Sequence, residues 1–175
     1  NGGIEEPFEG EERSLVASPK VATYDLKPEM SADEVTATLL DQLENFDMVI
    51  LNYANTDMFG HTGDIQACVK AVEKIDDCVR QVVEKTLQLD GKLLITADHG
   101  HCEQLRNADG SPQTAHTTYL VHLAYVSNDP KEFWLTDGIL ADIAPTLLHM
   151  LDVEKPEAMT GASRLVRKLK RDETA

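Results

Sequence analysis

The chain has 175 residues, of which 42% are hydrophobic, so we expect a single domain or part of one. Its 31 acidic and 16 basic residues give a formal net charge of -15, which argues against a nucleic-acid backbone as partner. No segment approaches the roughly twenty apolar residues of a membrane span, and no signal peptide opens the chain. We therefore expect a cytoplasmic protein whose three cysteines are reduced thiols.

The first predicted elements are a helix and a strand. Ser31 and Glu34 form a capping-box pattern, which predicts that a helix begins there and continues to about Asn45. The apolar residues 47–53 then predict a strand that is buried on both faces. Polar residues follow it in the segment 55–63, which contains Asp57 and His61.

A long helix and a second strand come next. Residues 64–89 carry one apolar stripe at helical spacing, which includes Ile65, Val69 and Val72 and predicts a helix with that stripe in the core. The apolar residues 92–97 predict a further strand. Strand, helix and strand in this order favour a right-handed crossover between parallel strands.

This second strand ends abruptly in Asp98, His99 and Gly100. A capping aspartate beside a hydrogen-bonded histidine is the simpler interpretation of that dipeptide taken alone. Ligands of parallel sheets, however, bind beyond the carboxyl ends of the strands, where Asp57 and His61 are also expected. Oxygen and nitrogen donors together suit a divalent metal such as zinc or manganese. The convergence therefore favours a metal site at one sheet edge.

The remaining chain predicts a turn-rich excursion, a strand, a helix and a tail. Residues 106–113 contain the turn formers, and residues 120–127 form the strand, with His122 expected in the core. Residues 141–151 predict an apolar helix with a proline in its early turn and with His149 in a structural role. The charged residues 164–175 are interpreted as a frayed helical tail.

Three motifs give the chain a family resemblance. They are Asp-Met-Phe-Gly-His-Thr-Gly at 57–63, Ala-Asp-His-Gly at 97–100 and Thr-Ala-His-Thr-Thr at 114–118. With them the chain resembles the cofactor-independent phosphoglycerate mutases of the alkaline phosphatase superfamily. Supporting matches lie at residues 1–3, 18–25, 28–31 and 141–146.

The resemblance implies a three-layer, alkaline-phosphatase-like α/β fold with a mostly parallel sheet, here incomplete. Residues 1–161 would be the C-terminal part of the metal-binding phosphatase domain, and residues 162–175 a charged C-terminal tail. The family is a glycolytic isomerase that interconverts 3-phosphoglycerate and 2-phosphoglycerate through a phosphoserine. The nucleophilic serine and one further metal-binding aspartate would lie in an N-terminal part that this chain lacks. The chain alone should therefore be inactive, with that missing part as its partner and a monomeric parent enzyme.

The resemblance also implies a ligand set for two Mn2+ ions, with Mg2+, Co2+ or Zn2+ as alternatives. Asp57, His61 and His116 would hold one ion, and Asp98 and His99 would contribute to the other. The family commonly has asparagine where this chain has His101, which we interpret as a donor behind the ligands rather than as a ligand itself.

Two other functions fit the same residues. The first is another metal-dependent enzyme of the superfamily, namely a phosphatase, phosphopentomutase or sulfatase, whose metal motifs are similar. The second is a non-catalytic metal-binding or interaction fragment that keeps its ligands but has no nucleophile.

Overall fold

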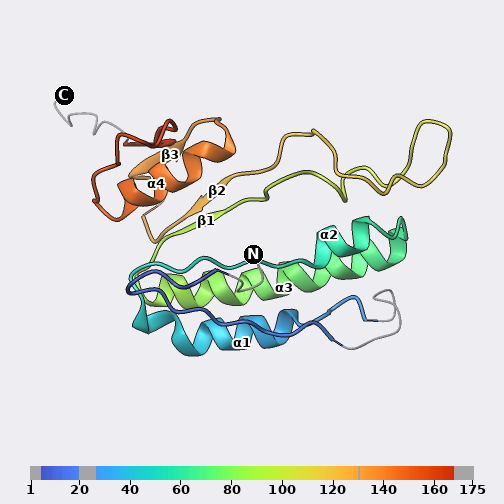
Figure 1. The fold of residues 1–175 in the computed structure, drawn as a ribbon, viewed down its shortest axis with the longest axis horizontal. Coiled ribbons are helices and arrows are strands. Elements are labelled where there is room, and N and C mark those ends of the chain that lie inside the picture. The colour runs from blue at the N-terminus through green and yellow to red at the C-terminus, as the bar shows by residue number, and fades with distance from the viewer. Residues whose placement is uncertain (1–4, 20–26, 130, 168–175) are drawn as a thin grey trace, which may run out of the picture. The chain divides into compact units, whose positions relative to one another are not determined.

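The computed structural model describes residues 5–19, 27–129 and 131–167 (Figure 1). Two compact units make up the chain, one of residues 1–85 and 101–117 and one of residues 86–100 and 118–175. The elements in chain order are α1 (Ala32–Gln42), η2 (Leu43–Asn45), α2 (Asn55–Gly60), α3 (Ile65–Gln88), β1 (Leu93–Ile95), β2 (Ala124–Val126), β3 (Phe133–Leu135), η3 (Leu140–Asp142), α4 (Ile143–Met150) and β4 (Leu165–Arg167). The α/β class predicted from the sequence is confirmed.

The helix expected after Ser31 is confirmed as α1 followed by η2, which ends at Asn45. The prediction of a capping box was wrong, because the Ser31 side chain makes no cap hydrogen bond. Its hydroxyl instead donates to the carbonyl oxygen of Ala17 at 2.8 Å. The hydroxyl therefore ties the preceding loop to the helix start.

The predicted long helix is confirmed as α3, but its buried face differs from the predicted one. Phe59 is fully buried against α3 in a cluster completed by Met30, Ala67, Cys68 and Ala71. Small side chains let the helix approach the Phe59 ring closely. Val69 and Val72 of the predicted stripe turn outward and are each 46% exposed, so their assignment to the core was wrong, whereas Val82 of the same stripe is buried as predicted.

The strand predicted at residues 47–53 is not formed, and Ile50 within it is 78% exposed. A strand needs a hydrogen-bonded neighbour, and none of the described residues pairs with this segment. The parallel crossover is therefore also absent from the described part of the chain. Residues 47–53 lead directly into α2, so Asp57 lies on a helix rather than at a strand end.

Both sheets of the described residues are antiparallel pairs in the second unit. β1 pairs with β2, with Leu94 opposite Tyr125. β3 pairs with β4, with Trp134 opposite Val166. The mostly parallel sheet that was expected is not seen in the described ranges, because their strands meet only antiparallel neighbours.

Two smaller expectations at the C-terminal side were also wrong. His122 is exposed rather than in the core, because the strand around it is confined to β2. The charged segment expected to be a frayed helix begins as strand β4, held by its pairing with β3. Residues 168–175 lie outside the described ranges, as do residues 1–3 and most of the match at 18–25. The expected boundary between residues 161 and 162 stays a prediction.

The buried carboxylate of Asp142, at the start of α4, joins two segments of the second unit. Its Oδ2 accepts hydrogen bonds from Arg164 Nε at 2.7 Å and from the Ile139 amide at 2.9 Å. Its Oδ1 accepts one from the Ala162 amide at 2.8 Å. The Arg164 hydrogen bond, followed by the two amides, holds the pKa of Asp142 well below its usual range.

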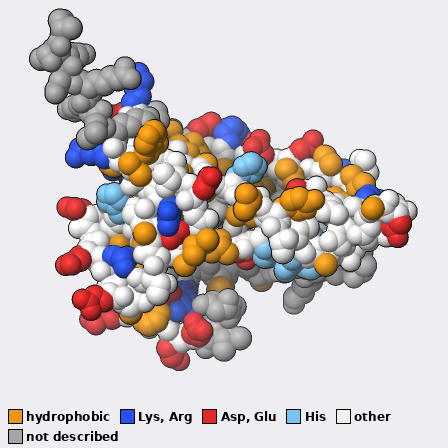
Figure 2. All heavy atoms as spheres, turned by 90° about the horizontal axis from the view of Figure 1, so that it is seen from above, with side chains coloured by type: hydrophobic (Ala, Val, Ile, Leu, Met, Phe, Trp, Pro, Cys, Tyr) orange, Lys and Arg blue, Asp and Glu red, His pale blue; other side chains and the backbone are white. Residues whose placement is uncertain are grey.

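Acidic side chains are scattered over the face shown in Figure 2 rather than gathered in one patch. None of the helices in the described ranges is both long and apolar enough to cross a bilayer.

Replacing Asp142 with asparagine tests whether its carboxylate stabilises the fold. A depressed folded-state pKa stabilises the protein above the unfolded value near 3.8, and this contribution is lost as the pH falls through the folded value. Asp142→Asn should therefore lower the urea midpoint at pH 7 and reduce its decline on acidification. The exposed Asp137→Asn is the matched control and should behave as the wild type. Equal midpoints at pH 7 for wild type and Asp142→Asn would contradict the assignment.

Candidate metal centre

Four side chains of the first unit converge on one point. They are Asp57, His61, His101 and His116, and one ligand atom from each lies within 4.8 Å of all the others. Asp57 lies on α2 and His61 caps its C-terminus, so the i,i+4 spacing places both on one face. His101 and His116 come from two loops of the same unit.

All three imidazoles face a single carboxylate oxygen. Oδ1 of Asp57 is 3.0 Å from His101 Nδ1, 3.0 Å from His116 Nε2 and 3.4 Å from His61 Nε2. His116 Nε2 is also 3.2 Å from His61 Nε2. An imidazole nitrogen that carries a proton can donate to this oxygen, and one that does not carry a proton can bind a cation through its lone pair. A positive ion between these atoms would satisfy all four groups.

The protonation of His61 supports the same conclusion. Its Nδ1 is 2.8 Å from the carbonyl oxygen of Thr114. A carbonyl only accepts, so Nδ1 carries the proton and the Nε2 of the neutral ring has a free lone pair. That lone pair can accept a hydrogen bond from His116 Nε2, which is 3.2 Å away, or bind a cation. A histidine whose other nitrogen donates to a backbone carbonyl is the usual arrangement of a metal ligand.

The Asp57 carboxyl is ionised in this environment. Burial raises its pKa, but the hydrogen bond from His101 and the charges of the three imidazoles outweigh burial, so the net pKa is lowered. Metal binding requires the carboxylate form. The site therefore has its anionic ligand at neutral pH.

The loop that carries His101 is tied to its surroundings by three contacts. Glu103 accepts the His101 backbone amide at 2.6 Å and also the hydroxyl of Thr117. The Cys102 thiol donates to the Thr56 carbonyl oxygen at 2.9 Å. Gly60 leaves room for the His101 ring, because a Cβ there would lie 2.6 Å from the ring atoms.

The sequence-predicted site residues fall into two groups. Asp57, His61 and His116 are brought together, and His101 joins them. Asp98 and His99 belong to the second unit, outside this group, with Asp98 Oδ1 3.7 Å from His99 Nε2. In the sequence, His101 stood out only as a histidine that directly follows the Asp-His-Gly motif. The residue type alone does not reveal that its ring is buried beside Asp57.

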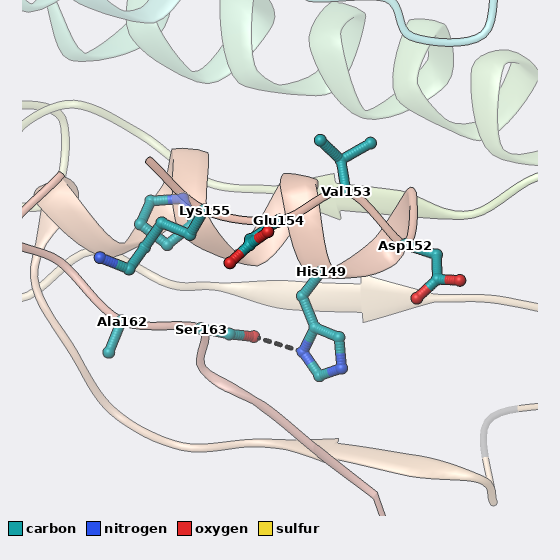
Figure 3. Close-up of a pocket in the computed structure, with 8 residues that line it drawn as sticks. His149, Asp152, Val153, Glu154, Lys155, Ala162 and Ser163 are labelled. Atoms are coloured by element: carbon teal, nitrogen blue, oxygen red, sulfur yellow. Dashed lines mark hydrogen bonds between the residues drawn. The ribbon is translucent and has the colours of Figure 1, made fainter. Parts of the chain in front are cut away.

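The second unit has an open pocket of its own beside α4 (Figure 3). His149 points toward Ser163, whose hydroxyl is 2.7 Å from His149 Nδ1. None of the predicted site residues lines this pocket.

The fold and the Asp–His group together indicate an α/β protein that binds a divalent metal ion. The sequence profile of the metalloenzyme superfamily matches residues 1–155. The chain belongs to this superfamily.

Relatives named 2,3-bisphosphoglycerate-independent phosphoglycerate mutase confirm the resemblance. The chain is 58% identical over 167 residues to the protein of Clostridium novyi (strain NT), covering 93% of this chain and 33% of the relative. It is 55% identical over 164 residues to that of Akkermansia muciniphila, covering 93% of this chain and 32% of the relative. The chain thus spans about a third of the length of the relatives it matches.

A solved structure agrees with these relatives. The crystal structure of Leishmania mexicana phosphoglycerate mutase at low cobalt concentration superposes with a TM-score of 0.78 at 26% identity. The match covers 87% of this chain and 31% of that one.

The close approach of Gly60 to His101 gives a direct test of the site's packing. Gly60→Ala should lower the free energy of unfolding by about 1–3 kcal/mol, because the new methyl group overlaps the buried ring. Thermal or urea unfolding measures this. In an open helix the same change stabilises by up to about 1 kcal/mol, so a more stable variant would contradict the observed packing.

Proposed function

We propose that the chain is part of the metal-binding phosphatase domain of a cofactor-independent phosphoglycerate mutase. This isomerase would interconvert 3-phosphoglycerate and 2-phosphoglycerate through a phosphoserine in glycolysis. The convergence of Asp57, His61 and His116 carries the proposal, because all three belong to the motifs of the resemblance. The names of the relatives support it.

The ligand assignment follows the motifs. Asp57, His61 and His116 hold one divalent ion, and Asp98 and His99 contribute to a second. Manganese is the proposed metal, and the low cobalt concentration at which the Leishmania mexicana structure was obtained is compatible with the same donors. Bound divalent ions neutralise a transferring phosphoryl group and lower the pKa of an attacking hydroxyl.

The residues of this chain prepare the site for an anionic substrate. The Thr114 carbonyl holds the proton of His61 on Nδ1, which leaves Nε2 free for a metal. Asp57 stays ionised because its pKa is lowered. Because the chain has a formal charge of -15, cations at these ligands would favour the binding of a phosphorylated acid.

The rest of the reaction is assigned to sequence outside this chain. By the resemblance, the nucleophilic serine belongs to the missing N-terminal part of the same enzyme, which would be monomeric and cytoplasmic. Residues 1–161 would form the C-terminal part of the phosphatase domain, followed by the charged tail. This polypeptide alone would bind metal without turning over phosphoglycerate.

Removing one proposed ligand tests the metal site. His116→Ala should weaken Mn2+ binding in calorimetry by about tenfold or more, because one of three proposed ligands is lost. The exposed His122→Ala is the matched control and should bind as the wild type does. Equal affinities for His116→Ala and wild type would exclude His116 as a ligand.

Mixing tests the proposed reaction. The chain alone in Mn2+ should not convert 3-phosphoglycerate, whereas mixing it with the remaining two thirds of the Clostridium novyi relative should restore conversion. A chain that hydrolyses a generic aryl phosphate on its own would instead indicate a different metal-dependent phosphatase. Metal binding without activity on mixing would favour a non-catalytic metal-binding fragment.

A further inference from the structure

His101 occupies a position in the metal centre that its motif does not assign to a ligand. Its side chain is 4% exposed, and its Nδ1 is as close to Asp57 Oδ1 as His116 Nε2 is, at 3.0 Å. Its ring lies edge-on to that of His61, with centroids 4.4 Å apart. The imidazole therefore belongs to the same tight group as the motif residues rather than to a layer behind them.

Four of the six donor–donor distances within the group are close to those between ligands of one ion, and all six lie within 4.8 Å. Asp57 Oδ1 is 3.0 Å from His101 Nδ1, 3.0 Å from His116 Nε2 and 3.4 Å from His61 Nε2. The Nε2 atoms of His61 and His116 are 3.2 Å apart. Tetrahedral ligands with metal–nitrogen bonds of about 2.0–2.1 Å stand about 3.3 Å apart. A simple His–Asp hydrogen bond would explain one of these contacts, but not three nitrogens around one oxygen.

We propose that His101 is a fourth protein ligand of the ion held by Asp57, His61 and His116, binding through Nδ1. The inference rests on the proposed metal site and deepens it. Three imidazoles and one carboxylate form a more nitrogen-rich set than two imidazoles and one carboxylate. Imidazole ligands suit zinc and cobalt, whereas oxygen donors suit manganese. His101 thus shifts the selectivity of this site from Mn2+ toward Co2+ and Zn2+.

The surrounding residues fix His101 in this position. Glu103 binds its backbone amide at 2.6 Å, and the neighbouring Cys102 thiol is anchored on α2 through Thr56. On the other side of the ring, Gly60 has no side chain to displace it. A ligand held from its backbone and accommodated by a glycine needs little rearrangement to bind an ion.

The test uses the full chain loaded with Co2+, whose ligated imidazoles give hyperfine-shifted N–H resonances in NMR. His101→Asn should show one such resonance fewer than the wild type. Its affinity for Co2+ and Zn2+ should fall by about tenfold or more, and that for Mn2+ by clearly less. The exposed His122→Asn is the matched control and should keep every resonance.

A measurement on the unaltered chain keeps the proposal testable if His101→Asn does not fold. With isotope-labelled histidine and Zn2+, the Nδ1 resonance of His101 and the Nε2 resonances of His61 and His116 should all shift. A His101 Nδ1 signal unchanged by Zn2+ while the other two shift would overturn this inference and leave the proposed function intact. No shift at any of the three would overturn both.

Discussion

The first unit is organised around one carboxylate oxygen faced by three imidazoles. Oδ1 of Asp57 draws together a helix and two loops that are distant in the chain. His101 is buried whereas Asp57, His61 and His116 are partly exposed, and a shared cation would pair with all four groups at once. The ties from Glu103 and Cys102, and the space left at Gly60, all serve to keep these groups facing one another.

The carboxylate of Asp142 in the second unit is satisfied in a different way from that of Asp57. Asp142 is 1% exposed and is satisfied by a guanidinium and two backbone amides, all supplied by its own unit. Nothing further is needed there, and its role is to join η3 to the segment that leads into β4. Asp57 instead faces three imidazoles, which bind metals as readily as they hydrogen-bond. This difference in partners distinguishes Asp142, whose carboxylate has a structural role, from Asp57, whose carboxylate is placed to bind a metal ion.

The longer helices α1, α3 and α4 were predictable from the sequence because their periodicity is local, whereas the short helix α2 was not predicted. α1 and α3 lie where apolar spacing placed them, whereas the strand expected at residues 47–53 depends on a distant neighbour that no described residue provides. At the site, motifs identified Asp57, His61 and His116, which the structure brings together. His101 was interpreted from the sequence as a donor behind the ligands, and its burial against α2 could not be predicted because a single residue type does not encode burial.

The only tryptophan of the sequence, Trp134, lies on β3 opposite Val166 and is 56% exposed. Intrinsic fluorescence therefore reports on the β3–β4 ribbon of the second unit, while α1, α2 and most of α3 belong to the first. Far-ultraviolet circular dichroism is dominated by those helices. The two optical signals thus follow different units, and a metal ion that stabilises only the first would shift the dichroism transition while the fluorescence transition stays in place.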